Sequence, residues 1–524
     1  MKKIGVISII LLLIAGAVYY YFALPAINIH SPGLWSFIIS ILIIIGIFVL
    51  SLKRNNKAVK TGYFAITITV VCIFVLGWLL SSEVINAGKY CQLINISERD
   101  FSNDIKEVNY NEIPSLDKDS AEKLGLRKMG TMGDLVSQFE VNNLYSQINY
   151  KNRPVRVTPL DYGDFFKWLT NRKNGIPAYI RIDMTTQDVE CVRLNEGIKY
   201  STSELLNRNI YRHLRFNYPT YIFDSISFEI DDNGIPVWIC PVRDYTIGLF
   251  GGVKIDKVVI VNALNGNTDL YKIDDVPNWV DRVYSADLLI SYYDYYGKLS
   301  NGYLNSIFGQ KGCLQTTYGY NYIALDDDVW VYTGVTSVAG DESNVGFVLM
   351  NQRTAETRYY SIAGAEEYSA MASAEGQVQH LGYKATFPLL LNIADQPTYF
   401  MALKDDAGLV KNYAMVNIAK YQIVAVGNSI LECEQNYIKL MDSNGIDNIE
   451  DTTPESIETE GIIEKITEVI VDGNSHYFIK LNSSDKLFDV DVINNIKILD
   501  YAVGSNVKLT YIEGINYNTV NIVY

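Results

Sequence analysis

The sequence has few of the residues on which most enzyme active sites depend. Its 524 residues include four histidines and six cysteines. The histidines, His30, His213, His380 and His476, show no metal-ligand spacing, and no Cys-x-x-Cys pair occurs. His-Glu-x-x-His, Gly-x-Ser-x-Gly, P-loop and dinucleotide-binding glycine motifs are also missing. We therefore expect no catalytic residue, no metal ligand and no cofactor, in a protein that is not an enzyme.

Basic residues are too few for a nucleic-acid footprint. Lys and Arg total 44 against 59 Asp and Glu, which gives a formal net charge of -15. A phosphate polyanion requires clustered cationic side chains. The composition therefore argues against a nucleic-acid partner.

Acidic residues are missing from the first 82 positions, which hold three uncharged apolar runs, Ile4–Leu24, Leu34–Leu52 and Gly62–Leu80. Each is close to the roughly 20 residues that a helix needs to cross a bilayer. The runs predict three transmembrane helices that serve as an anchor. A cleavable signal peptide is the alternative for the first run.

The basic residues of this region predict its orientation. They lie at the start of the chain and between the second and third runs, at Lys2, Lys3, Lys53, Arg54, Lys57 and Lys60. The loop Pro25–Gly33 has no Lys or Arg. Because basic loops stay in the cytoplasm, we expect a multi-pass protein of the cell membrane with residues 83–524 extracytoplasmic.

One hairpin pattern recurs four times after this region. Val258–Ile273 (VVIVNALNGNTDLYKI) and Phe347–Ile362 (FVLMNQRTAETRYYSI) share Val, Asn, Thr, Tyr and Ile at equal spacing. Tyr179–Leu194 fits the frame with Asp183 at the Asn position, and Tyr413–Asn428 fits more loosely with Asn417 there. Each copy reads as a strand, an Asx-led turn and a second strand.

Helical patterns and further hairpins precede two of these copies. Helices are predicted at Ser203–Asn217 and Ala365–Tyr383, and hairpins at Ser225–Cys240 and Ala385–Leu403. One unit is then helix, hairpin, hairpin, and we expect its helix to pack on a small antiparallel sheet.

This unit resembles the PepSY domain, a module of secreted-peptidase propeptides and envelope proteins. The family's last hairpin has an Asp or Asn that closes a strand, followed by a Thr-Gly turn, and Asn262–Gly266 comes nearest to it. The other copies have Gln187, Ala355 and Tyr421 at the Gly position. Trp279–Tyr284 and Ser306–Gly312 are similar to segments of membrane-anchored proteins of Gram-positive bacteria.

Two further segments carry candidate sites. Val276–Phe308 is rich in tyrosine, and we predict two helices joined at Gly297. Such a stripe is typical of a core, and the alternative is a Tyr-lined groove for a peptide or glycan. The acids Asp326-Asp327-Asp328 and Asp341-Glu342 are typical of solvated turns, and Ca²⁺ binding is the alternative.

The end of the chain reads as a linker and a barrel. Asp442–Glu460 carries seven acids and no Lys or Arg, which favours a disordered linker. Residues 461–524 contain five predicted strands with a helical turn between the third and fourth, an order that resembles an OB-type barrel.

Together these patterns predict an α+β fold with three N-terminal transmembrane helices, repeated PepSY-like helix-plus-sheet units and a C-terminal OB-like β-barrel. The expected domains are the anchor 1–82, units at 83–195, 196–275, 276–362 and 363–441, the linker 442–460 and the barrel 461–524.

The leading functional hypothesis is an integral membrane protein that binds or regulates a protein or peptidase partner in the bacterial envelope. A carboxylate-dependent cell-wall hydrolase is an alternative, because the separation of two catalytic carboxylates is not visible in a sequence. A self-associating envelope scaffold is a third possibility.

Overall fold

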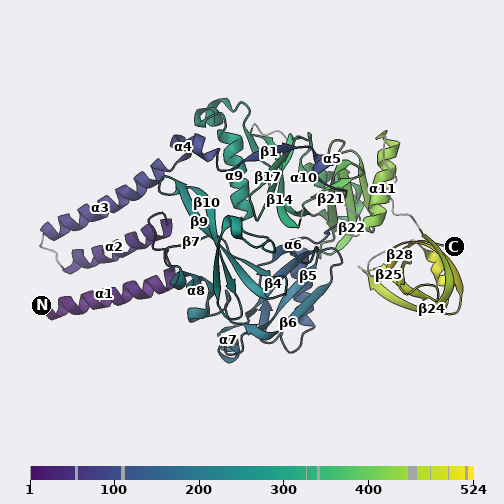
Figure 1. Ribbon diagram of the computed structural model, residues 1–524, viewed down its shortest axis with the longest axis horizontal. Helices are drawn as coiled ribbons and strands as arrows, with labels where there is room; N and C mark the ends of the chain where they lie inside the picture. The colour runs from purple at the N-terminus through teal and green to yellow at the C-terminus, as the bar shows by residue number, and fades with distance from the viewer. Residues whose placement is uncertain are drawn as a thin grey trace. The chain divides into compact units, whose positions relative to one another are not determined.

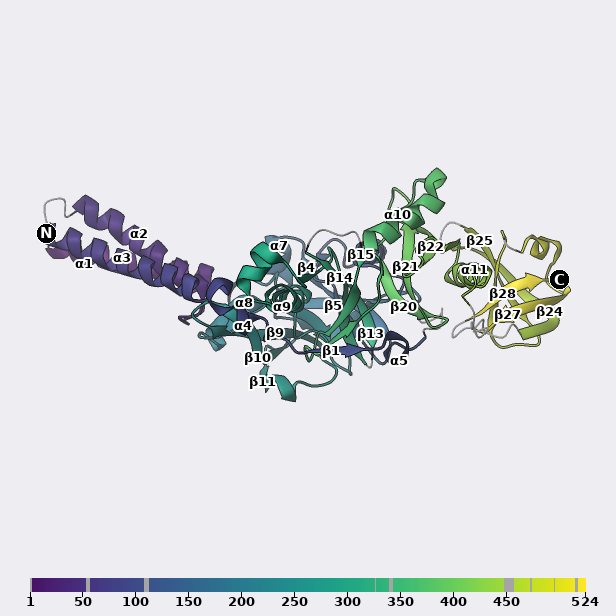
Figure 2. The ribbon, with the colours of Figure 1, turned by 90° about the horizontal axis from the view of Figure 1, so that it is seen from above.

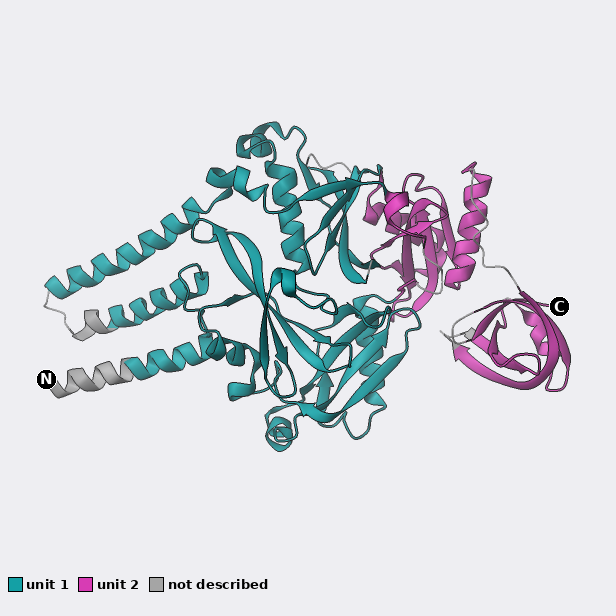
Figure 3. Ribbon diagram, viewed as in Figure 1, with its two compact units in different colours: residues 1–100, 116–363 teal, residues 101–115, 364–524 magenta. Residues whose placement is uncertain are grey.

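The computed structural model describes residues 2–52, 57–107, 113–325, 327–338, 343–446, 457–471, 474–493, 495–513 and 517–524. They form two compact units (Figure 3), one of residues 1–100 and 116–363 and the other of residues 101–115 and 364–524. Most of the expected linker, Asp326, the Asp341-Glu342 pair, and Lys53 and Arg54 lie outside the described residues.

Three apolar helices open the chain, α1 (Lys2–Ala23), α2 (Pro32–Leu52) and α3 (Lys57–Leu80). Among the described residues, α3 alone is long and apolar enough to cross a membrane, with a mean hydropathy of 2.4. The apolar stretches described in α1 and α2 are Leu13–Ala23 and Pro32–Ile47, shorter than the roughly 20 residues that a crossing needs. The expectation of three transmembrane helices is therefore wrong, and the structure has one candidate span.

The rest of the chain is rich in β-strands and mixes them with helices in an α+β arrangement. Four sheets of the described chain share the same arrangement of strands (Figure 1). In each, two short strands both pair with the same longer strand, and two more strands extend the sheet by antiparallel pairing. A helix precedes the short strands in every sheet. The edge of each sheet is thus split into two short strands.

The elements of the first two sheets all belong to the first unit. The first sheet follows α6 (Lys118–Gly130) and contains β2 (Phe139–Val141), β3 (Ser146–Asn149), β4 (Pro154–Tyr162), β5 (Ile176–Asp183) and β6 (Val189–Ile198), with α7 (Phe165–Asn171) after β4. The second follows α8 (Ile210–Asn217) and contains β7 (Ile222–Phe223), β8 (Ser227–Ile230), β9 (Pro236–Ile247), β10 (Gly251–Asn262) and β11 (Thr268–Lys272).

The third sheet gains a sixth strand from the start of the chain. It follows α9 (Ala286–Leu299) and contains β12 (Leu314–Thr316), β13 (Asn321–Leu325), β14 (Asp328–Ser337), β16 (Gly346–Asn351) and β17 (Thr357–Tyr360). The added strand β1 (Ile96–Arg99), which follows α4 (Glu83–Tyr90), pairs in parallel with β17 in an otherwise antiparallel sheet.

The second sheet is buried on both faces. Trp238 and Val259 belong to a core shared with the first sheet, while their neighbours Ile239 and Val258 belong to a core shared with α9 and the third sheet. Successive side chains of a strand point to opposite faces, so β9 and β10 form the centre of the first unit.

Four Asx residues form the turns of the last hairpins, as the repeat pattern predicts. Asn262 Oδ1 accepts hydrogen bonds from the backbone N–H groups of Leu264 and Asn265 at 2.9 and 3.2 Å. Asp183, Asn351 and Asn417 make the same kind of bond in their own turns. Gln187, Gly266 and Ala355, four residues after the Asx, all have a positive φ near 60–80°. Two copies therefore hold this backbone conformation without glycine.

Two sequence expectations about helix and strand ends are wrong. Helix α9 continues through Gly297 without a break. A Cβ at this position would clash with the carbonyl of Leu314, so the glycine permits a close approach of β12 and does not end a helix. The hairpin expected over Ala385–Leu403 begins with a strand over Ala385–Ile393 in the sequence pattern, but the structure divides this strand into β19 (Lys384–Ala385) and β20 (Leu389–Ile393). Pro388 lies in the gap and has no N–H to donate to a ladder.

The second unit holds the fourth sheet and a barrel. The sheet follows α5 (Phe101–Asp104) and α10 (Glu367–Gln377), precedes α11 (Ile430–Ser443), and contains β19, β20, β21 (Gln396–Lys404), β22 (Val410–Asn417) and β23 (Val424–Gly427). The closed barrel has the order β24-β25-β26-β28-β27, from β24 (Ile457–Val471), β25 (Asn474–Leu481), β26 (Leu487–Asp491), β27 (Asn506–Ile512) and β28 (Asn518–Val523). The expected five-stranded barrel is present, and its OB-type assignment stays a prediction.

Candidate functional site

A cavity of about 490 Å³ lies in the first unit, next to the carboxyl end of the candidate membrane span. Its walls come from the α3–α4 junction, the turn between β9 and β10, and α9. Six aromatic side chains line it: Trp78, Tyr90, Phe250, Tyr292, Tyr295 and Tyr303. The remaining lining residues are serine, glycine, aliphatic residues and one glutamate, and the volume lies within the range of small-ligand sites.

Ser81 fixes the junction of α3 with the β9–β10 turn. Its hydroxyl donates to the Gly77 carbonyl at 2.6 Å and accepts from the backbone N–H groups of Leu249 and Phe250 at 2.8 and 2.9 Å. A Cβ at Gly251 would lie 2.6 Å from the Ser81 carbonyl, so the turn can approach this closely only with glycine there. The turn and the end of α3 therefore form one rigid wall.

Tyrosines of α9 and α4 form the opposite wall. The Tyr292 hydroxyl donates to the Val253 carbonyl at 2.7 Å, and the Tyr90 hydroxyl donates to the Ser81 carbonyl at 2.7 Å. The Tyr90 and Tyr295 rings lie 4.7 Å apart between centroids. Burial raises the pKa of Tyr295 to about 12, so this phenol stays neutral at physiological pH.

Glu83 supplies the one carboxylate in the lining of the cavity. It is half-buried at the start of α4, and burial raises its pKa, while the charge of Lys298 opposes that shift. Lys298 itself pairs with Asp294 at 3.1 Å. No hydrogen bond joins the Glu83 carboxylate to another described residue, so its oxygens stay available to a ligand.

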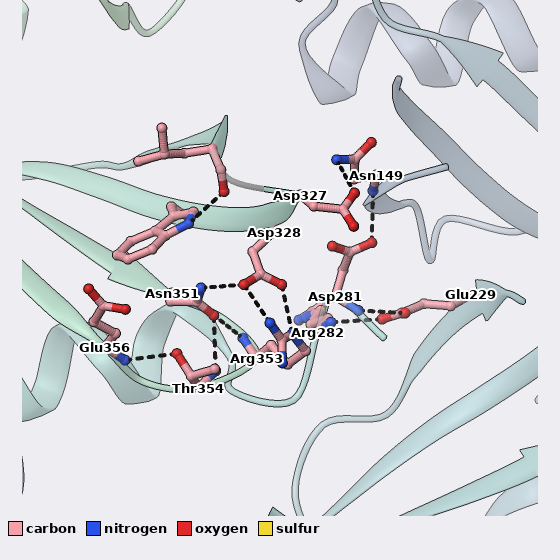
Figure 4. Close-up of polar contacts among 12 residues, drawn as sticks. Asn149, Glu229, Asp281, Arg282, Asp327, Asp328, Asn351, Arg353, Thr354 and Glu356 are labelled. Atoms are coloured by element: carbon pink, nitrogen blue, oxygen red, sulfur yellow. Dashed lines mark hydrogen bonds and ion pairs between the residues drawn. The ribbon is translucent and has the colours of Figure 1, made fainter. Parts of the chain in front are cut away.

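A second candidate, the buried carboxylates of Figure 4, lies where the first three sheets meet. Glu229 of β8 is fully buried and accepts from the N–H groups of Asp281 and Arg282 at 3.1 and 3.0 Å. Asp281 is also buried, and its Oδ2 accepts from the Asn149 N–H at 2.7 Å. Its Oδ1 has no hydrogen-bond partner among the described residues.

Burial dominates the electrostatics of this pair. Desolvation raises the pKa of Glu229 to about 7, against the lowering effect of its two backbone donors. Desolvation and the nearby charge of Glu229 raise the pKa of Asp281 well above its usual range. Neither residue lines the cavity. Both carboxylates are almost fully buried, whereas glycoside or peptide hydrolysis requires carboxylates that the substrate can reach.

The acids for which Ca²⁺ binding was the alternative to solvated turns make other contacts where the structure describes them. Asp328 receives two hydrogen bonds from Arg353, at 2.7 and 2.8 Å, and one from Asn351 Nδ2 at 2.8 Å (Figure 4). Asp327 accepts from Asn149 Nδ2 at 3.0 Å. Within the described residues, no three His, Cys, Asp or Glu side chains group together as a metal site would require.

The Tyr-rich segment divides between the two roles considered for it. Tyr284, Leu289 and Tyr293 are buried in the core, whereas Leu288, Tyr295 and Tyr303 line the cavity. Glu83 is not among the residues that the sequence singles out, although it is the first acid after the apolar runs. Nor does the sequence single out Glu229 and Asp281, which are distant in sequence and meet only in the fold.

Comparison with known proteins gives no identification. No family model matches the chain, and no curated protein matches it. Among solved structures, a chimera of ACO and RPE65 aligns at 8% identity and a TM-score of 0.15, over 75% of this chain and 66% of the chimera. A levansucrase variant of B. megaterium aligns at 8% identity and a TM-score of 0.17, over 73% of this chain and 84% of the levansucrase. Likeness at this level carries no functional argument, and the PepSY resemblance stays a prediction.

Proposed function

We propose that this protein is a membrane-anchored binding protein of the bacterial envelope, whose body after α3 lies outside the cytoplasm and recognises a protein or peptide partner. Lys57 and Lys60 lie at the first turn of α3, and the positive-inside rule keeps that end in the cytoplasm. The cavity then opens beside the outer end of the span.

The observation that carries the proposal is the composition of the cavity. It pairs aromatic walls with the Glu83 carboxylate, which has no hydrogen-bond partner among the described residues. A cation is attracted both to the faces of aromatic rings and to a carboxylate. The cavity therefore suits a lysine side chain or amino terminus presented by a partner. Hydrolysis is less well supported, since one carboxylate lines the cavity and the buried pair lies elsewhere.

A matched pair of probes tests this role. We expect the full-length protein in detergent to bind the tripeptide Ala-Lys-Ala, followed through the change in tryptophan fluorescence that Trp78 in the cavity wall contributes, and not Ala-norleucine-Ala. Glu83→Gln should lower the affinity for Ala-Lys-Ala at least tenfold, because the substitution removes the negative charge of the side chain and keeps its size. Glu140→Gln is the control, since Glu140 is exposed on β2, outside the cavity. Equal binding of both peptides, or by both variants, would refute the role of the cavity.

Protease treatment of intact cells tests the orientation separately. The region after Leu80 should be cut in intact cells, because it is proposed to face the exterior. Cutting only after the cells are opened would place this region in the cytoplasm and contradict the envelope role.

A further inference from the structure

The edge of the third sheet is completed by a separate segment of the chain. Strand β1 pairs in parallel with β17, with Ile96 opposite Thr357, Glu98 opposite Tyr359 and Arg99 opposite Tyr360. The Ser97 hydroxyl donates to the Thr357 carbonyl at 3.2 Å. An edge strand presents a row of backbone donors and acceptors that an extended chain can pair with. In this sheet, the protein itself supplies that chain.

The corresponding edge of the second sheet has no such strand. Strand β11 ends its sheet, and no described strand pairs with its outer side. It keeps the residues of the shared frame, with Thr268 at the place of Thr357 and Tyr271 at the place of Tyr360. Leu270, at the place of Tyr359, is 46% exposed. Figure 2 shows β11 at the rim of its sheet.

The last strands of the other two sheets are less suited to this role. Strand β6 has Val189 and Val192 in place of the shared threonine and tyrosine. In the fourth sheet, α11 packs against β23, and the Asn436 side chain donates to the Val426 carbonyl. Strand β11 is therefore the edge most similar to the one that β1 covers.

Hairpin geometry shows which backbone groups of β11 point outward. The Asn262 N–H donates to the Asn267 carbonyl, and the next pairs are Val261 with Thr268, Ile260 with Asp269 and Val259 with Leu270. Hydrogen-bonded and non-bonded pairs alternate along an antiparallel ladder. The backbone groups of Thr268 and Leu270 therefore face away from β10, as those of Thr357 and Tyr359 face β1.

We propose that the outer edge of β11 binds an extended segment of a partner protein as a parallel strand, in the manner of β1 on β17. Asp269 lies at the place of Arg358, and Asp274 and Asp275 follow shortly after the strand. The incoming strand should therefore carry a basic residue where β1 has Ser97, opposite this position. The proposal rests on the binding role above but uses a surface separate from the cavity.

The test uses a fluorescent heptapeptide with the sequence of residues 94–100 and a second one carrying Ser97→Lys. Anisotropy of each peptide is followed against the full-length protein in detergent. Both should bind, the lysine peptide about threefold more tightly, which is the size of an exposed cross-strand charge pair. Hydrogen–deuterium exchange should slow in the segment 268–272 and not in β6.

Leu270→Pro is the decisive variant, because it removes an outward N–H and leaves the β10–β11 ladder intact. Leu270→Pro should lower the affinity for the peptide at least tenfold. Leu270→Ala keeps the N–H, so its affinity for the peptide should stay within about threefold of the wild-type value, a change of the size that one cross-strand side-chain contact contributes. Unchanged far-UV circular dichroism shows that both variants fold.

Three outcomes would overturn the proposal: no saturable peptide binding by the wild type, equal binding by Leu270→Pro, or exchange protection confined to other segments. A molecular mass that doubles in the absence of peptide, and that Leu270→Pro returns to the mass of one chain, would assign the β11 edge to a second copy of this chain. That result would also overturn the proposal. Ala-Lys-Ala should bind equally to the wild type and to Leu270→Pro, because Leu270 does not line the cavity, so failure of the cavity role and failure of the edge role are distinguishable.

Discussion

The fully buried Glu229 should make the stability of the first unit fall as the pH rises. Burial raises its pKa to about 7 in the folded protein, from an ordinary value near 4.5. Between these values, the folded state holds a proton that the unfolded state has released. The stabilisation is therefore complete below pH 4.5 and is lost as the pH rises through 7. From pH 5 to pH 8 the loss is about 2–3 kcal/mol, at 1.36 kcal/mol for each pKa unit.

Glu229→Gln removes the titration but also changes the hydrogen bonding. Both carboxyl oxygens accept from a backbone N–H, and the amide nitrogen of Gln can replace neither acceptor. We expect the variant to be less stable than the wild type at pH 5 by about 1–3 kcal/mol, the cost of an unpaired buried donor. The difference should shrink by about 2–3 kcal/mol at pH 8, because only the wild type then has to bury a charge.

Tryptophan fluorescence during denaturant unfolding measures this in the full-length protein. All six tryptophans belong to the first unit, and Trp238 and Trp330 are almost fully buried, so the signal reports that unit alone. Glu140→Gln, on an exposed residue, should keep the wild-type pH dependence. The reasoning is refuted if the stability difference between wild type and Glu229→Gln is the same at pH 5 and pH 8.

Two substitutions test the packing around the candidate sites. Gly297→Ala should destabilise the first unit by about 1–3 kcal/mol in thermal unfolding, because the added Cβ would clash with the Leu314 carbonyl. Gly376→Ala is the control. It should be neutral or stabilising, because the space around Gly376 is open. Arg353→Lys should cost about 1–3 kcal/mol by denaturant titration, because lysine cannot make the two-bond contact with Asp328. Arg193→Lys, in an exposed pair with Asp134, should cost less than about 1 kcal/mol, and equal costs for the two arginine variants would contradict the importance of burial.

The sequence predicts the local parts of this fold well. The Asx turns at Asp183, Asn262, Asn351 and Asn417 follow from residues within a few positions of one another. The five-stranded barrel follows from alternating patterns and turn residues in one short segment. In both cases, the contacts that decide the structure lie close together in the chain, so their residue types are sufficient.

Prediction fails where distant segments decide the structure. Gly297 has the sequence pattern of a helix end, but it lies inside α9, where the absence of a side chain allows the Leu314 carbonyl to approach closely. Glu229 lies in β8 and Asp281 in the irregular segment before α9, so they meet only in the fold, and Glu83 lies near Tyr295 only because α4 packs beside α9. Such contacts leave no local pattern. The three apolar runs are equally uncharged in sequence, yet α3 alone gives a described span of sufficient length.

The second sheet joins the two candidate sites through a rigid element. The cavity lies at the turn between β9 and β10, while Glu229 pairs with Val237 near the opposite end of β9. Because β9 and β10 are buried on both faces, their central amide groups should open only with global unfolding of the first unit. Hydrogen exchange should therefore be slowest at Trp238–Cys240 and Val258–Ile260 and faster at the exposed β11. Faster exchange in the centre than in β11 would mean that the sheet flexes, and the cavity and the buried carboxylates would then not be held at a fixed separation.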